Sequence, residues 1–208
     1  MPDRCPICSD QGPSAVTVHG ADFEIAACPN CGILYQRAAE GSVSVDPYSD
    51  LFNTEVAIPT LDEMLKCPYA TGTFEQIRLD LQSVGLARGR LLDIGCYLGL
   101  LMGFMRQNGW DVTGIDLCRK AIDWARSQGL RCSCTAIEDF SPDGAYDVIV
   151  LKHVLEHLRD PVGALRRMSG WLTGNGAIYV RVPNADSWGV RRSRRSFVGH
   201  LKPFEHLF

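Results

Sequence analysis

The sequence from Arg90 onward alternates apolar runs with segments of helical periodicity, and this alternation constrains the fold most. The runs RLLDIG, WDVTGIDL, LRCSCTA, YDVIVL and GAIYVRV are typical of strands, and the segments LLMGFMRQNG, RKAIDWARSQG and DPVGALRRMSGWL are typical of helices. Gly129 should end the second helix, and Asp160 followed by Pro161 should begin the third. Alternating strands and helices predict parallel βαβ units, so we expect an α/β, doubly wound sheet.

Two CxxC pairs precede this region. They comprise Cys5 with Cys8 and Cys28 with Cys31, and short alternating stretches between them favour a hairpin that joins two zinc knuckles. Four thiolates can bind one Zn²⁺ tetrahedrally, which leaves no open position for a substrate. The four cysteines therefore predict a structural zinc site. The remaining five of the nine cysteines are expected to be free thiols.

The 208 residues suffice for one α/β core and a small appended module. We expect three parts: a zinc-ribbon module over 1–38, a connector and amphipathic helix over 39–85, and the α/β domain over 86–208. The helix is predicted from the spacing of four apolar residues, namely Phe74, Ile77, Leu81 and Val84. A net charge of −3 gives no overall attraction to polyanions, and no apolar run is long enough for a membrane span. We therefore expect a cytoplasmic protein with no membrane partner.

The turn in LLDIGCYLGL, residues 91–100, predicts a ligand site, because ligands of doubly wound sheets bind beyond the carboxyl ends of the strands. Gly95 allows a tight turn and Gly99 opens the next helix. The dinucleotide fingerprint needs further glycines where Tyr97 and Leu100 stand, so a nicotinamide cofactor is disfavoured. Because a side chain does not easily adopt positive φ, Tyr97 should change the turn locally, or its ring should cover part of the ligand.

The spacing of Asp93, Gly95 and Gly99 resembles the DxGxGxG motif of class I S-adenosylmethionine-dependent methyltransferases, with Tyr97 in place of the middle glycine. GIDLCRKAIDWA resembles the second motif, in which an acid at the position of Asp116 holds both ribose hydroxyls. AIEDF resembles the segment beside the adenine, and YDVIVLKHVLEHLRDP resembles the fourth strand and its loop. The resemblance implies a Rossmann-like domain over 86–208 and this cofactor-binding set: Asp93, Gly95, Cys96, Tyr97, Gly99, Asp116, Leu117, Ile137, Glu138 and Lys152.

The order of cysteine ribbon, connector and methyltransferase motifs resembles the zinc-ribbon methyltransferases that include sugar C-methyltransferases. This resemblance implies a small, sugar-like acceptor linked to a nucleotide. It also implies catalytic roles for Glu205 and His206 in an acid/base step, and for His153 in stabilising an oxyanion. Class I methyltransferases finish with two further strands, so we expect this domain to lack the last strands.

Several alternatives remain open. The pattern HVLEH matches the HxxEH of zinc proteases, but that site needs both histidines on a regular helix, whereas His153 directly follows a predicted buried strand. Residues 153–157 also resemble an ExxEH segment that binds Mg²⁺ in some methyltransferases. RRSRR, residues 191–195, could clamp a diphosphate, or could hold RNA in an RNA methyltransferase, so nucleic acid is possible but not favoured. A non-catalytic cofactor-binding or zinc-ribbon adaptor is a third candidate. Oligomeric state is not predicted.

Overall fold

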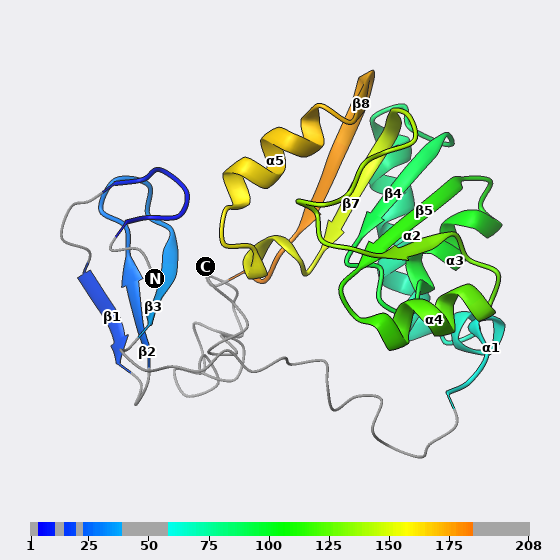
Figure 1. The fold of residues 1–208 in the computed structure, drawn as a ribbon, viewed down its shortest axis with the longest axis horizontal. Coiled ribbons are helices and arrows are strands. Elements are labelled where there is room, and N and C mark those ends of the chain that lie inside the picture. Colours follow the sequence, from blue (N-terminus) through cyan, green and yellow to red (C-terminus); the bar gives the residue numbers. More distant parts are fainter. Residues whose placement is uncertain (1–3, 11–14, 20–22, 39–57, 185–208) are drawn as a thin grey trace. The chain divides into compact units, whose positions relative to one another are not determined.

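A computed structural model describes residues 4–10, 15–19, 23–38 and 58–184. Its contacts divide the chain into two compact units (Figure 1). One unit contains both CxxC pairs and residues 153–165, and the other is formed by residues 48–152 and 166–180. The predicted catalytic pair Glu205 and His206 and the segment RRSRR lie outside the described residues.

The cysteine-containing unit has a three-stranded antiparallel sheet in the order β1-β2-β3. Its strands are β1 (Ala15–His19), β2 (Phe23–Ala27) and β3 (Leu34–Ala38). The β1–β2 hairpin lies between the two cysteine pairs, as predicted, while β3 was not expected as a strand. A small core of Cys5, Ala26, Cys28 and Tyr35 is buried in this unit. So small a core is typical of modules that depend on a bound metal.

The second unit is built on a five-stranded sheet in the order β6-β5-β4-β7-β8. The strands are β4 (Arg90–Ile94), β5 (Asp111–Asp116), β6 (Cys132–Cys134), β7 (Tyr146–Lys152) and β8 (Leu172–Arg181). The β4–β5, β4–β7 and β5–β6 pairs are parallel. Tyr146 donates its amide hydrogen to Trp171 and His153 donates to Arg181, so β7 and β8 also run in the same direction. The predicted doubly wound α/β fold is therefore confirmed.

The strand order reverses between β4 and β7, which are neighbours in the sheet but not in sequence. Ligands of doubly wound sheets bind outside the carboxyl ends of the strands at this reversal. Val148, Ile149, Val150 and Leu151 are all buried, as expected of a central strand covered on both faces. The turn after β4 thus follows a strand that is paired on both sides.

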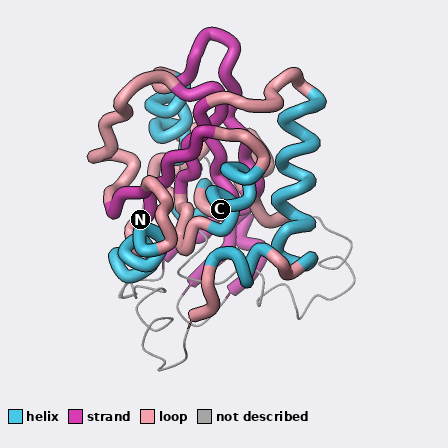
Figure 2. The backbone as a smooth tube through the Cα atoms, turned by 90° about the vertical axis from the view of Figure 1, so that its right-hand side faces the viewer, coloured by secondary structure: helices cyan, strands magenta, loops and turns pink. Residues whose placement is uncertain are grey.

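Helices lie on both sides of the strands (Figure 2). They are α1 (Leu61–Leu65), α2 (Pro68–Ser83), α3 (Leu100–Gln107), α4 (Arg119–Ser127) and α5 (Pro161–Ser169), with a 3₁₀ turn, η1, at Leu155–His157. Gly129 follows α4 at a φ of 76°, and the Asp160 carboxylate accepts the Gly163 amide at 2.8 Å, so both predicted helix ends are confirmed. None of the helices in the described part of the chain is long and apolar enough to cross a membrane.

The amphipathic helix predicted within 39–85 is α2, which begins at Pro68, six residues before the first apolar residue of the predicted spacing, Phe74. Phe74, Ile77 and Leu81 are buried as predicted, but Val84 is 66% exposed. Val84 is the residue that ends the helix, so the helical spacing no longer places it on the buried face. The prediction for Val84 was wrong.

The short helix α1 was not predicted. Thr60 and Glu63 form a capping box at its start. Leu61 packs onto Gly103 of α3, where an added Cβ would lie only 2.8 Å from a Leu61 methyl carbon. The contact needs a glycine in the middle of α3. The sequence around Leu61 alone does not reveal this distant partner, so α1 was missed.

Candidate cofactor site and cysteine centre

The turn after β4 has positive φ at three alternate residues. The angles are 73° at Gly95, 49° at Tyr97 and 71° at Gly99. The amides of Gly95 and Cys96 both donate to the Ile115 carbonyl, at 2.8 and 3.1 Å. Tyr97 therefore has the positive φ that a side chain does not easily adopt, contrary to the premise of the sequence prediction. The alternative, that its ring covers part of the ligand, stays a prediction. Left-handed backbone is unfavourable for a bulky residue, so surrounding contacts must hold it.

The Asp116 carboxylate supplies one such contact. Its Oδ2 accepts the Tyr97 amide at 2.8 Å, and its Oδ1 accepts the Cys118 amide at 2.7 Å. One side chain thus joins the turn after β4 to the turn after β5. Each carboxylate oxygen can accept more than one hydrogen bond, so Asp116 keeps capacity for a ligand with paired hydroxyls.

Gly99 is required for packing as well as for backbone conformation. A Cβ at this residue would lie 2.3 Å from a Leu130 methyl carbon. Gly99 is also the first residue before α3, whose free amides favour an electron-rich ligand. The two glycines kept from the motif and the bonded Tyr97 together form an open, backbone-lined turn.

Asp93, at the end of β4, is only 3% exposed. Burial raises the pKa of its carboxyl from 3.8 to about 8; the positive charge of Lys152 opposes this, and the nearby Asp116 adds to it. Below about pH 8 this carboxyl is therefore held mainly as the neutral acid, and a cation placed beside it would favour its ionised form.

The other predicted cofactor residues differ in their environment. Leu117, next to Asp116, is 72% exposed, whereas Ile137 is buried. The side chain of Glu138 is exposed, and its carbonyl accepts a bond from Arg167 at 3.2 Å. Cys96 is buried on the core side of its turn: a Cβ added at Gly114 would lie 2.8 Å from its sulfur. Cys96 therefore offers a ligand its backbone rather than its thiol.

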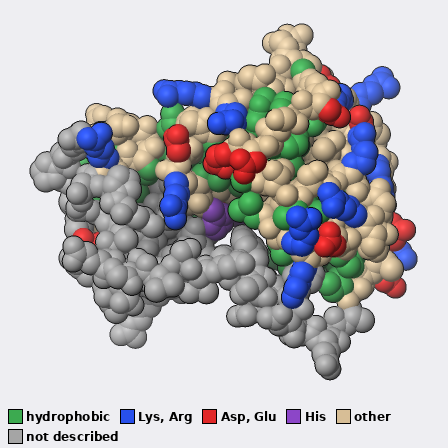
Figure 3. Space-filling view, in the orientation of Figure 1, with side chains coloured by type: hydrophobic (Ala, Val, Ile, Leu, Met, Phe, Trp, Pro, Cys, Tyr) green, Lys and Arg blue, Asp and Glu red, His purple; other side chains and the backbone are tan. Residues whose placement is uncertain are grey.

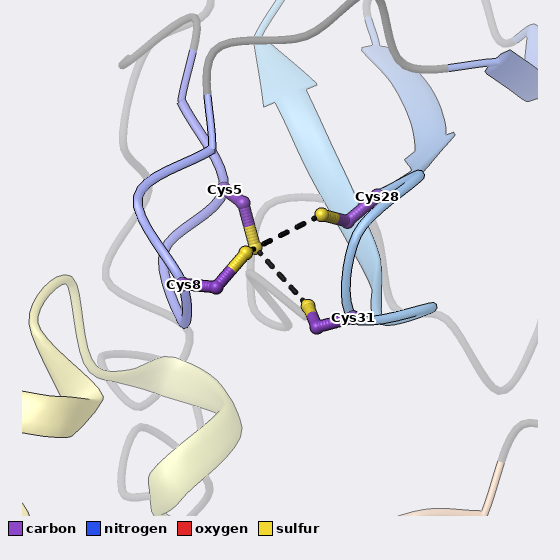
Figure 4. Close-up of side chains that lie close together, drawn as sticks. All are labelled: Cys5, Cys8, Cys28 and Cys31. Atoms are coloured by element: carbon purple, nitrogen blue, oxygen red, sulfur yellow. Dashed lines mark hydrogen bonds between the residues drawn. The ribbon is translucent and has the colours of Figure 1, made fainter.

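The four cysteine sulfurs of the other unit lie together, all within 4.8 Å of one another (Figure 4). Cys5 and Cys31 are 3.6 Å apart, and Cys8 and Cys28 are 3.5 Å apart. A tetrahedral Zn²⁺ with bonds of ~2.3 Å would hold its sulfurs ~3.8 Å from one another. The donor set and its spacing therefore fit a closed structural zinc site.

The surroundings of the metal-free cysteines shift their pKa values in opposite directions. A hydrogen bond from the Asp10 backbone lowers the pKa of Cys8 to about 7, although burial opposes this shift. Burial raises the pKa of Cys5; a backbone hydrogen bond at Ile33 lowers that of Cys31, but burial and the neighbouring thiols raise it to about 12. Metal ligation needs deprotonated sulfur, so Cys8 is the ligand most readily ionised before a metal binds. The amide of Gly32, a residue at a φ of 73°, bonds the Cys28 carbonyl at 2.9 Å and closes the second knuckle.

His153 directly follows β7 and has a φ of 57°. Its Nδ1 lies 3.3 Å from Oε1 of Glu156, a residue of η1 that is 1% exposed. The zinc-protease interpretation requires both histidines on one regular helix. His157 lies in the 3₁₀ turn η1 and His153 lies outside it, so this requirement is not met. Sequence patterns did not reveal the burial of Glu156, because a single 3₁₀ turn has no periodicity to read.

Comparison with known proteins agrees with this geometry. Residues 69–207 match the family model described as "Methyltransferase domain". A ubiquinone biosynthesis O-methyltransferase from Marinobacter nauticus is 34% identical over 136 residues, covering 61% of this chain and 54% of the relative. The corresponding enzyme of Chromobacterium violaceum is 31% identical over 121 residues, covering 53% and 52%. The chain thus spans about half the length of the curated relatives it matches.

Solved structures show the same fold. The plantazolicin methyltransferase BpumL, in complex with a desmethyl analogue and SAH, has a TM-score of 0.54 and 24% identity, with 67% of this chain and 56% of that chain covered. CalS10, an amino pentose methyltransferase from Micromonospora echinaspora solved with SAM bound, has a TM-score of 0.52 and 18% identity, with 63% and 59% covered.

Proposed function

This chain belongs to the methyltransferase-domain family, and on that premise we propose that it transfers the methyl group of S-adenosylmethionine to a small, sugar-like acceptor linked to a nucleotide. The observation that carries the proposal is the Asp116 carboxylate, which joins two strand ends while keeping acceptor capacity. In this proposal Asp116 would accept hydrogen bonds from the ribose hydroxyls. Leu117 and Ile137 would hold the adenine, and the turn that contains Gly95 would hold the amino-acid end.

The chemistry needs little from the protein beyond positioning. An electron pair of the acceptor attacks the methyl carbon in line with the carbon–sulfur bond, whose electrons return to sulfur and leave a neutral thioether. The sulfonium is already activated, so the gain comes from orienting the two reactants. The acceptor must also lose a proton, and the resemblance assigns this step to Glu205 and His206. Both residues lie outside the described part of the chain.

The nature of the acceptor is supported by the order of the modules. The four-cysteine cluster followed by the methyltransferase domain has the module order of the zinc-ribbon methyltransferases, which favours a small acceptor. On the face drawn in Figure 3, basic and acidic side chains of the described residues are interspersed. An RNA substrate would need a basic surface, and the segment RRSRR that could supply one lies outside the described residues.

The test is methyl transfer from radiolabelled S-adenosylmethionine. We expect label to pass to a nucleotide-linked keto-deoxysugar and not to total RNA. Transfer to RNA that weakens steeply with added salt would instead indicate the RNA methyltransferase. Cofactor binding without transfer to any member of a panel of sugars, phenols and amines would indicate an adaptor.

A further inference from the structure

We propose that Cys118 and Cys134 form a reversible disulfide site beside the cofactor turn, through which a peroxide lowers the affinity of the chain for its cofactor. Cys134 is the last residue of β6, and Cys118 lies two residues beyond the end of the neighbouring strand β5. The effect on affinity rests on the proposed function, because it assumes that the cofactor binds at Asp116. Formation of the bond does not depend on that function.

The sulfur of Cys134 already lies against the peptide group that precedes Cys118. Cys134 is the partner of Asp116 in the parallel β5–β6 ladder. Its Sγ lies 3.4 Å from the carbonyl oxygen of Leu117, which belongs to the peptide bond between Leu117 and Cys118. Disulfides usually join Cα atoms ~4.4–6.8 Å apart, a range that includes the ~4.8 Å spacing of neighbouring strands. A local shift of the Leu117–Cys118 segment therefore suffices to join the two sulfurs.

The strand fixes the direction in which Cys134 points. Alternate residues of a strand point to the same face, so Cys132 and Cys134 share one face of β6. The Cys132 sulfur lies 3.8 Å from the Ile122 carbonyl of α4, which shows that α4 covers this face. Cys134 is nearer the carboxyl end of β6 and therefore faces the start of α4. Cys118 is the N-cap residue of α4, and its side chain makes no capping hydrogen bond that would hold it to the helix.

Access to an oxidant distinguishes this pair from the other cysteines of the second unit. Cys118 and Cys134 are both partly exposed, whereas Cys96 and Cys132 are buried. Cys67 is exposed, but it precedes α2 and follows neither of these strands. Oxidation of a thiol needs contact with the oxidant, and a disulfide needs a second thiol nearby. Cys118 and Cys134 meet both conditions.

The reaction balances with hydrogen peroxide as the oxidant. The thiolate of one cysteine attacks a peroxide oxygen and becomes a sulfenic acid, and the hydroxide that leaves takes up the proton of that thiol as water. The second thiolate then attacks the sulfenic sulfur, and the S–S bond forms as a second hydroxide leaves and becomes water. Two thiols and one hydrogen peroxide thus give one disulfide and two waters. A thiol reductant reverses the bond by exchange.

The disulfide would disturb the carboxylate that the cofactor is proposed to use. Oδ1 of Asp116 accepts the Cys118 amide at 2.7 Å. Drawing Cys118 toward β6 moves the amide that orients this oxygen, so the oxidised chain should bind the cofactor more weakly. The coupling is reciprocal, so bound cofactor should oppose formation of the disulfide to the same extent.

The first experiment maps the bond in the full chain after treatment with hydrogen peroxide. In a tryptic digest without reductant, the peptide that contains Cys118 should be joined to the peptide that contains Cys132 and Cys134, and fragmentation should place the bond at Cys134. Dithiothreitol should remove the link, and Cys67→Ser should retain it, whereas Cys118→Ser and Cys134→Ser should lose it. No link, or a link through Cys132, would overturn the proposal whether or not the chain is a methyltransferase.

The second experiment titrates S-adenosylhomocysteine into reduced and peroxide-treated protein. Treatment should weaken binding by wild type by roughly 5–150-fold, the usual range of coupling between two sites, and dithiothreitol should restore it. Cys134→Ser should bind equally before and after treatment. Equal affinity of reduced and cross-linked wild type, or an equal loss in Cys134→Ser, would overturn the control of affinity by this disulfide. Failure of reduced wild type to bind would instead contradict the proposed function.

Discussion

The Tyr97 amide lies 2.8 Å from Oδ2 of Asp116, so a residue at left-handed φ is held by the carboxylate of the neighbouring strand end. This bond explains how the turn tolerates a tyrosine where the motif has a glycine. It also makes the shape of the turn depend on Asp116. The same carboxylate therefore stabilises the unfavourable backbone of Tyr97 and offers its remaining lone pairs to a ligand.

The first prediction compares two residues of this turn. Gly99→Ala should lower the free energy of unfolding by about 2–3 kcal/mol, because positive φ and the 2.3 Å approach of Leu130 both oppose a methyl group. Gly109→Ala is the matched control: Gly109 has a φ of 85° with nothing within 4 Å, so it should cost only about 1 kcal/mol. Equal losses in urea unfolding would show that the Leu130 contact is unimportant.

The second prediction also concerns the turn. Tyr97→Gly should change the free energy of unfolding by less than about 1 kcal/mol, because relief of the φ of 49° offsets the greater freedom of glycine in the unfolded chain. The measurement is again urea unfolding, with Tyr35→Gly as the contrasting variant. Tyr35 is 3% exposed in the other unit and should lose several times more. A loss above about 3 kcal/mol at Tyr97 would mean that its ring is an essential packing element.

The third prediction is a pH dependence of stability. Because the pKa of Asp93 is raised from 3.8 to about 8 on folding, the folded chain binds more protons between these values. The contribution of Asp93 to the free energy of unfolding should therefore be greatest below about pH 4 and fall as pH rises, by roughly 1 kcal/mol per pH unit near pH 6. Urea unfolding of the cofactor-free chain measures this slope.

Asp93→Asn is the control for that experiment. It removes the titrating group while keeping nearly the same shape, so most of the slope should disappear. If wild type and Asp93→Asn show parallel pH profiles, Asp93 is not the source of the dependence.

The fourth prediction concerns the cysteine centre. Freshly purified, reduced protein should contain about one zinc per chain, and Cys28→Ser should lose it, because a closed site needs all four ligands. The N-terminal unit should then unfold, with cofactor binding largely retained, because the ligands of the two sites lie in separate units. Cys67→Ser, at an exposed cysteine of the other unit, should keep its zinc. If metal analysis finds no zinc in the wild-type protein, the predicted zinc site is contradicted.

Much of the fold could be predicted because its signals are local. Strand–helix alternation and helix ends such as Gly129 follow from periodicity and capping. The exposure of Val84, the packing of Leu61 on Gly103 and the positive φ of Tyr97 depend on distant residues, which short sequence windows do not contain.

Some residues of the candidate site could likewise be predicted from the sequence, and others could not. The spacing of the two CxxC pairs was enough to predict that the four cysteines lie together. The resemblance to a motif identified Asp116. The burial of Glu156 beside His153 was missed, because it results from the path of a short turn after β7 rather than from a repeating pattern. Glu205 and His206 lie beyond the described residues and remain predictions.

The most direct test of the cofactor site is calorimetric titration of S-adenosylhomocysteine into wild type and Asp116→Ala, with the exposed Asp123→Ala on α4 as control. We expect wild type and the control to bind equally. Asp116→Ala should bind more weakly by roughly 1–3 kcal/mol, about 5–150-fold in Kd, because the ribose hydroxyls lose a charged acceptor. Equal affinity in all three proteins, or no binding by wild type, would contradict the assignment of this site.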